Sequence, residues 1–146
     1  MKKNMSEEVE FLNYIYKNAE MGIIGIDNII KKVNDEKFEK ILNSQKEEYE
    51  KVCDEAENIL KKYGKQNEEV GTIAKVSTAI MSEMSMLKDD SMQNIAKLMV
   101  EGTNKGIIEI TEKINSYNNT DAEIVVLATR LKTILEKNIE ELKKYL

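Results

Sequence analysis

The sequence has no histidine, no proline and no tryptophan among its 146 residues, and Cys53 is its single cysteine. The lack of histidine removes the usual general base and the base partner of Ser-His or Cys-His nucleophile pairs. One cysteine leaves no internal disulfide framework, which suits a reducing cytosol. The lack of proline, together with only six glycines, favours long uninterrupted helices.

Long apolar runs are missing as well. No stretch has the length and apolarity to span a bilayer, and the first residues lead into acidic ones without the apolar region of a signal peptide. The net charge is -5, with lysine and glutamate interleaved. Because nucleic-acid phosphates require a basic stripe, no nucleic-acid partner is expected. The sequence thus predicts a cytoplasmic protein that binds neither membranes nor nucleic acid.

An internal repeat is the most informative feature that is present. Gly22-Ile23-Ile24 reappears as Gly106-Ile107-Ile108, and Leu60-Lys61-Lys62-Tyr63 reappears as Leu142-Lys143-Lys144-Tyr145. Because each half of the chain carries one copy of both motifs, each half is expected to be a pair of helices.

Capping residues indicate where the helices begin and end. Ser6 can cap the first helix, Asn34-Asp35 separates it from the second, and Gly64 is a natural C-terminal stop. The second half contains two matches to the capping box: Asp90 with Gln93, and Thr120 with Glu123.

These signals predict one domain over residues 1–146, with a helical pair at 6–64, a shorter helix at 68–87 and a second pair at 91–146. The four long helices would each measure roughly 40 Å. The shorter helix can carry the chain back along the bundle, which makes the second and third long helices parallel. That connectivity is the single-crossover arrangement of ferritin-like bundles. A five-helix up-and-down array is the alternative.

The segments Gln45–Tyr49, Met99–Ile110 and Leu142–Leu146 resemble parts of small, uncharacterised ferritin-like proteins of anaerobic bacteria. The resemblance covers most of the chain, but the shared motifs are packing motifs. It implies an all-α, ferritin-like four-helix bundle and transfers no catalytic residue.

A ferritin-like fold raises the hypothesis of a di-metal centre. Such a centre takes Glu from two helices and Glu-x-x-His from two others, all directed inward. This chain has no histidine, and on a helical wheel its mid-bundle acids lie beside the apolar seams or face outward, with none on the seam of the last helix. The acids concerned are Glu20, Asp27, Glu48, Glu55, Glu101 and Glu112. We therefore predict no catalytic residue, no metal ligand and no cofactor.

Three functions remain in competition. The favoured one is a non-catalytic structural or protein-interaction bundle. The first alternative is a ferritin-like carboxylate-metal redox or metal-storage protein. The second is a Cu(I) binder that uses the thioethers of Met81, Met84 and Met86, although such clusters more often fill gaps or form adaptable contact surfaces.

Apolar residues outside the predicted inward faces form two outer strips. Tyr14, Met21 and Ile24 lie on the first helix, and Leu98 and Ile108 lie on its counterpart in the second pair. One crossover helix can cover only one strip, so the other is expected to bind a protein partner or a second copy in a homodimer.

Two uncharged polar residues, Gln45 and Thr103, interrupt the inward faces near mid-bundle. An unpaired buried amide or hydroxyl costs roughly 1 to 3 kcal/mol. We therefore predict a small polar layer in which each residue bonds to the other, to a helix carbonyl or to a trapped water.

Overall fold

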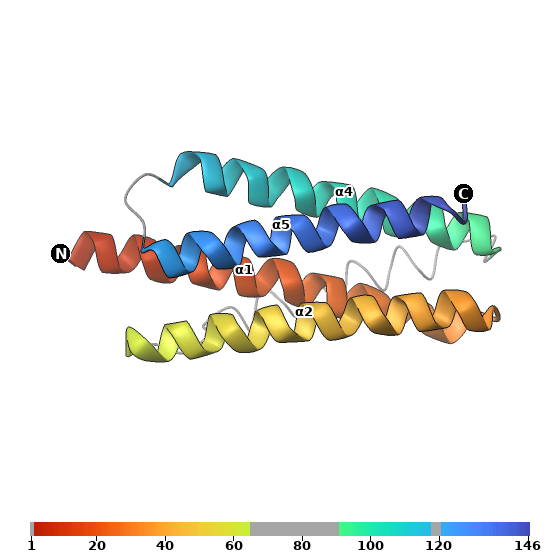
Figure 1. The fold of residues 1–146 in the computed structure, drawn as a ribbon, viewed down its shortest axis with the longest axis horizontal. Helices are drawn as coiled ribbons and strands as arrows, with labels where there is room; N and C mark the ends of the chain where they lie inside the picture. The colour runs from red at the N-terminus through yellow and green to blue at the C-terminus, as the bar shows by residue number, and fades with distance from the viewer. Residues whose placement is uncertain (1, 65–90, 118–120) are drawn as a thin grey trace.

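The computed structural model describes residues 2–64, 91–117 and 121–146. These residues form four α-helices: α1 Lys2–Ile29, α2 Glu36–Lys62, α4 Met92–Ser116 and α5 Ala122–Lys143, with a short 3-10 helix at Ile30–Lys32. Within the described ranges there is no β-strand. The predicted all-α bundle is confirmed (Figure 1). The helix predicted at 68–87 lies outside the described residues.

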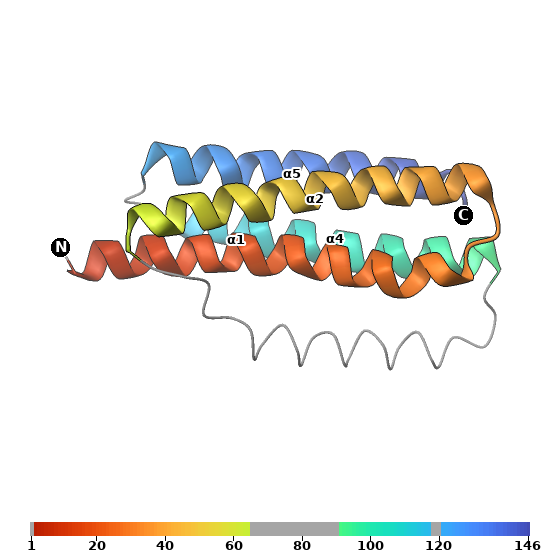
Figure 2. The same ribbon diagram turned by 90° about the horizontal axis from the view of Figure 1, so that it is seen from below.

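The helix directions agree with the predicted topology. α1 and α2 form one antiparallel pair, and α4 and α5 form the other (Figure 1). α2 ends at one end of the bundle and α4 begins at the opposite end, so these two helices run parallel (Figure 2). The two pairs meet where α1 packs beside α4 and α2 packs beside α5, and α1 also contacts α5 across the bundle. Within the α1–α4 and α2–α5 contacts the helices are antiparallel, whereas α1 and α5 are parallel (Figure 1).

The two predicted ends of α2 occur at the expected residues. The carboxylate of Asp35 accepts a hydrogen bond of 2.8 Å from the Phe38 N–H and so caps α2. Gly64 follows α2 with a φ of 69°, a left-handed conformation that glycine adopts without steric cost. Local chemistry was sufficient to predict both ends.

The predicted caps of the other helices differ from those observed. α4 is capped by Ser91, which accepts from the Asn94 N–H at 3.3 Å, and α5 is capped by Asp121, which accepts from the Glu123 N–H at 2.9 Å. The predicted caps Asp90 and Thr120 lie outside the described residues. Ser and Asp have similar capping preferences, so neighbouring candidates compete and backbone geometry decides. α1 begins at Lys2, before the proposed cap.

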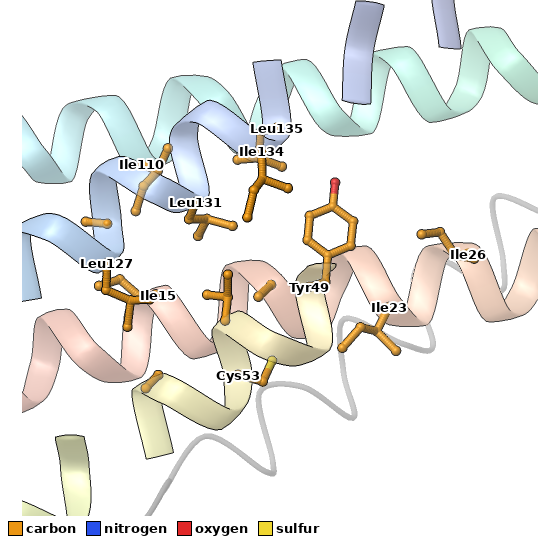
Figure 3. Packing of buried hydrophobic residues seen from close by; sticks show 14 of the residues in the cluster. Ile15, Ile23, Ile26, Tyr49, Cys53, Ile110, Leu127, Leu131, Ile134 and Leu135 are labelled. Carbon is orange, nitrogen blue, oxygen red and sulfur yellow. The ribbon is translucent and has the colours of Figure 1, made fainter. Parts of the chain in front are cut away.

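One continuous apolar core runs through the bundle and includes residues from all four helices. At one end, the rings of Phe11 and Tyr117 lie 4.8 Å apart and join α1 to the end of α4. At the other end, Phe38 and Tyr145 stack at 4.3 Å and join α2 to the end of α5. Figure 3 shows the core between these ends. Packing of this core fixes where the side chains near the middle of the bundle lie. Among the described helices, none has the length and apolarity needed to cross a bilayer.

Candidate functional site

A set of buried polar side chains occupies the middle of the bundle. We call Gln45, Tyr49, Thr103 and Asn138 the polar layer. Asn138 is 0 % exposed and Gln45 is 1 % exposed. The side-chain amide of Gln45 donates to the main-chain carbonyl of Asn138 at 3.4 Å and to the Glu141 carboxylate at 3.2 Å. Gln45 therefore ties α2 to α5 through two acceptors.

Thr103 is satisfied within its own helix. Its hydroxyl donates to the Met99 carbonyl one turn earlier, at 2.7 Å. Gln45 and Thr103 thus each bond a helix carbonyl, but these carbonyls lie on different helices. Nearby, the Asn18 amide donates to the Gly106 carbonyl at 3.2 Å and ties α1 to α4.

Tyr49 fits into the layer because Gly22 has no side chain. A Cβ at Gly22 would lie 2.7 Å from Cε2 of Tyr49, closer than van der Waals contact permits. The Tyr49 ring extends from α2 toward the middle of the bundle (Figure 3). Burial raises the pKa of Tyr49 to about 12, while the neighbouring Asn138 amide opposes the shift. The phenol therefore stays protonated at neutral pH.

Asn138 is the least satisfied member of the layer. Neither its Oδ1 nor its Nδ2 has a hydrogen-bond partner within normal geometry. The amide lies near enough to Tyr49 to affect its pKa, so the two groups are neighbours without a well-formed bond. A buried amide in this condition makes the layer sensitive to substitution.

The carboxylates nearest the middle of the bundle form ion pairs at its surface. Glu48 pairs with Lys137 at 2.8 Å, and Asp27 pairs with Lys46 at 2.7 Å. Within the described ranges, no three Cys, Asp or Glu side chains are grouped so that they could hold a metal ion. Glu141 of the last helix is half-buried and accepts a hydrogen bond from Gln45, so a carboxylate lies close to the apolar seam of that helix.

Cys53 and Glu20 form a contact between α2 and α1. The thiol donates to the Glu20 carboxylate at 3.7 Å. Burial raises the pKa of Cys53, and the negative charge of Glu20 raises it further. Burial also raises the pKa of Glu20, although the thiol bond opposes this shift. A thiol held protonated in this way is a poor nucleophile and a poor metal ligand.

The structure alters the prediction for the outer strips. The Tyr14 hydroxyl donates to Glu109 at 3.1 Å, and the Lys113 ammonium lies 5.2 Å from its ring centroid. Tyr14 is therefore part of the α1–α4 contact. Leu98 packs against the core, and Met21 and Ile24 are partly buried. Ile108 is 52 % exposed and is the most accessible residue of the two strips.

The three methionines of the Cu(I) hypothesis, Met81, Met84 and Met86, lie outside the described residues. Met92 is exposed at the start of α4, whereas Met99 is partly buried against the core.

Sequence reasoning missed Asn138, although a signal was present. Leu131, Leu135, Asn138 and Leu142 follow the four-three-four spacing of an inward helix face, and all four are buried. An asparagine in such a series is a candidate for a buried polar contact.

Comparison with known proteins gives one match. A family model for a domain of unknown function (DUF2383) matches residues 7–116. The match includes most of α1 and all of α2 and α4, and it ends before α5, which carries Asn138. No curated protein matches the chain, and no solved structure matches it.

Proposed function

The chain belongs to the DUF2383 family, and on that premise we propose that it is a non-catalytic helical bundle that acts by binding protein surfaces. The observation that carries the proposal is the chemistry of the polar layer. Its amides and hydroxyls are neutral at physiological pH. A site that activates a substrate or holds a metal needs titratable or anionic groups there.

The surroundings of the layer support the same proposal. Glu48 is engaged by Lys137, and Glu20 is engaged by Cys53. Glu141 is the carboxylate that Gln45 contacts, and a single carboxylate beside neutral amides is a poor metal site. We further propose that the bundle is ferritin-like in connectivity, with amides at the level where ferritin-like enzymes carry metal. Cys53 is a free cysteine whose thiol is protonated. This suits a reducing compartment, and we place the protein in the cytoplasm.

Metal analysis of protein purified without chelator tests this function. We expect iron, manganese, zinc and copper each to be well below one equivalent per chain. Added Fe(II) or Mn(II) should leave the melting temperature unchanged, because an ion that does not bind the folded state cannot stabilise it. Stoichiometric iron or manganese that is lost in Glu20→Gln or Glu141→Gln would establish the redox or storage alternative. Copper that is lost when Met81, Met84 and Met86 become leucine would establish the Cu(I) alternative.

We also propose that a second copy docks on the outer side of α4 around Ile108, giving a homodimer. The exposure of Ile108 supports this choice, and the bonding of Tyr14 within the α1–α4 contact argues against the α1 strip. Ile108→Lys should weaken the dimer about 30-fold, because loss of a central apolar contact costs about 2 kcal/mol.

Sedimentation velocity at high micromolar concentration measures this effect. Ile24→Lys is the matched control, with the same substitution on the other strip, and should leave the dimer intact. Wild-type protein that sediments only as a monomer contradicts the proposal. Dissociation by Ile24→Lys alone would move the interface to α1.

A further inference from the structure

The face between α2 and α5 has an ordered set of charges along its edge. Glu48 pairs with Lys137 at 2.8 Å, and Glu55 pairs with Arg130. In both pairs α2 supplies the acid and α5 supplies the base. A third pair on this face, Lys62 with Glu123 at 3.0 Å, has the opposite polarity. Arg130 is the only arginine in the chain.

The internal repeat shows which charges occupy equivalent positions in the two helical pairs. When the two Leu-Lys-Lys-Tyr segments are aligned, Arg130 falls at the position of Glu48, and Lys137 falls at the position of Glu55. If α2 packed against α2 of a second copy in the antiparallel register of the α2–α5 contact, Glu48 of each copy would face Glu55 of the other. If α5 packed against α5, Arg130 would face Lys137 at two places. Both pairings bring like charges together. In this alignment Lys62 and Glu123 correspond to Lys144 and Ile41, so pairing of equivalent helices creates no like-charge contact there.

The interior of this face has the same asymmetry. In the same alignment Asn138 corresponds to Ala56, and Glu141 corresponds to Ile59. Against a second α2, the buried amide of Gln45 would therefore keep a main-chain carbonyl, that of Ala56, but lose the carboxylate acceptor. A buried amide that loses a hydrogen bond destabilises the contact, and this adds to the charge repulsion.

The α1–α4 face lacks this arrangement. Lys113 pairs with Glu10 at 3.6 Å, and Tyr14 donates to Glu109. When Gly22 is aligned with Gly106, Lys113 falls at Ile29 and Glu109 falls at Gly25. Pairing of equivalent helices there would produce no like-charge contact at these positions. Discrimination therefore rests on the α2–α5 face.

We propose that Glu48, Glu55, Arg130 and Lys137, together with Gln45, make the first helical pair select the second and reject its equivalent in another copy. Two similar helical pairs in one chain can also associate with their equivalents in another copy, which leads to incorrect dimers or open chains. Opposite charges between a first and a second pair, with like charges between two first pairs or two second pairs, are an effective means of preventing these associations.

Two oppositely charged variants test the proposal. The acidic chain carries Arg130→Glu and Lys137→Glu, so that α2 and α5 are both acidic at these positions. The basic chain carries Glu48→Lys and Glu55→Lys, so that both are basic. All chains also carry Ile108→Lys, so that docking through Ile108 does not contribute. Each chain alone should melt about 5 °C or more below its parent, because both edge pairs become repulsive.

Refolded together, the two chains should exchange helical pairs. The first pair of each then faces the second pair of the other with opposite charges restored. Native mass spectrometry should show a 1:1 heterodimer at about tenfold or greater excess over either homodimer, since about 1.4 kcal/mol of preference is enough. The chain with all four reversals should be monomeric and melt within about 2 °C of its parent.

Lys97→Glu with Lys105→Glu is the matched control for the acidic chain. It makes the same change in net charge at exposed positions of α4, and it should form no 1:1 complex with the basic chain. A statistical mixture of dimers, or a fourfold variant as unstable as the double variants, would overturn the proposal. Heterodimer formation by the control would show that net charge alone drives association, which also overturns it.

Discussion

Asn138→Asp should destabilise the protein at neutral pH by about 4 kcal/mol, the largest effect that we expect from a single atom exchange. The new carboxyl group would have nearly the shape of the amide but would lie at a fully buried position. Gln45 bonds both the Asn138 carbonyl and the Glu141 carboxylate, so the new charge would lie near an existing negative one. Burial of such a group raises its pKa by about three units.

The loss should depend on pH with a defined sign. The folded-state pKa would lie above the unfolded value of about 3.9, so the folded state would hold the proton more tightly than the unfolded state. The variant should therefore be close to wild type below pH 4 and lose stability as the pH rises toward neutrality. Urea unfolding at a series of pH values measures this dependence.

Asn138→Leu is the control. It removes two buried atoms that have no partners, and it should change the free energy of unfolding by no more than about 1 kcal/mol, without the pH dependence. An Asn138→Asp variant as stable at pH 7 as at pH 4 would show that water reaches this position.

Gly22→Ala should lower the free energy of unfolding by about 2 kcal/mol, although alanine is the better helix former. Helix propensity alone would stabilise the variant by about 1 kcal/mol. The added methyl group, however, would overlap the ring of Tyr49, which is 3 % exposed and held by the core on all sides. Overpacking of this kind typically costs about 1 to 3 kcal/mol. The upper end applies here, because the methyl group would lie 2.7, 2.8 and 3.0 Å from three ring atoms, and after the gain in propensity a loss of about 2 kcal/mol is left.

The repeat supplies the comparison for this prediction. Gly106 is the counterpart of Gly22, but a Cβ there would lie 3.5 Å from the Asn18 Oδ1 and 3.6 Å from the Leu135 Cδ1, which is ordinary contact. Gly106→Ala should therefore raise the melting temperature by a few degrees, where Gly22→Ala should lower it by about 7 °C. Thermal unfolding followed by circular dichroism gives both values. Equal effects at the two glycines would contradict the close approach of Tyr49.

Tyr49→Leu should partly rescue Gly22→Ala. Leucine is the residue at the equivalent position of the second pair, Leu131. At position 49 its smaller side chain would leave more space beside position 22. A gain for the double variant over the sum of the single changes would identify the clash as the cause.

The helices could be predicted from the sequence because their signals are local. The absence of proline and the apolar period define four long helices, and Asp35 and Gly64 mark a start and a stop within one turn of the chain. The repeat extends this prediction to paired helices. Prediction was poorer at Ser91 and Asp121, where neighbouring residues are equally able to cap and only the backbone path selects one.

Contacts between the helical pairs depend on tertiary structure. The periodicity places Gln45 on an inward face, but its acceptors are on α5, more than ninety residues away in the chain. Tyr14 was assigned to an outer strip, yet Glu109 and Lys113 of α4 bind it. Such pairings depend on the lateral order and register of the helices, which a helical wheel does not contain.

The sequence by itself determined an all-α chain of two similar helical pairs without histidine chemistry, because composition, period and capping act within a helix or between neighbouring turns. Only the tertiary structure decided that Tyr49 needs the space above Gly22, that the Asn138 amide is buried without a well-formed hydrogen bond, and that Glu48 and Glu55 of α2 face bases of α5. These features arise when helices distant in the chain are packed at one register, where atomic overlap, lost hydration and charge pairing become defined.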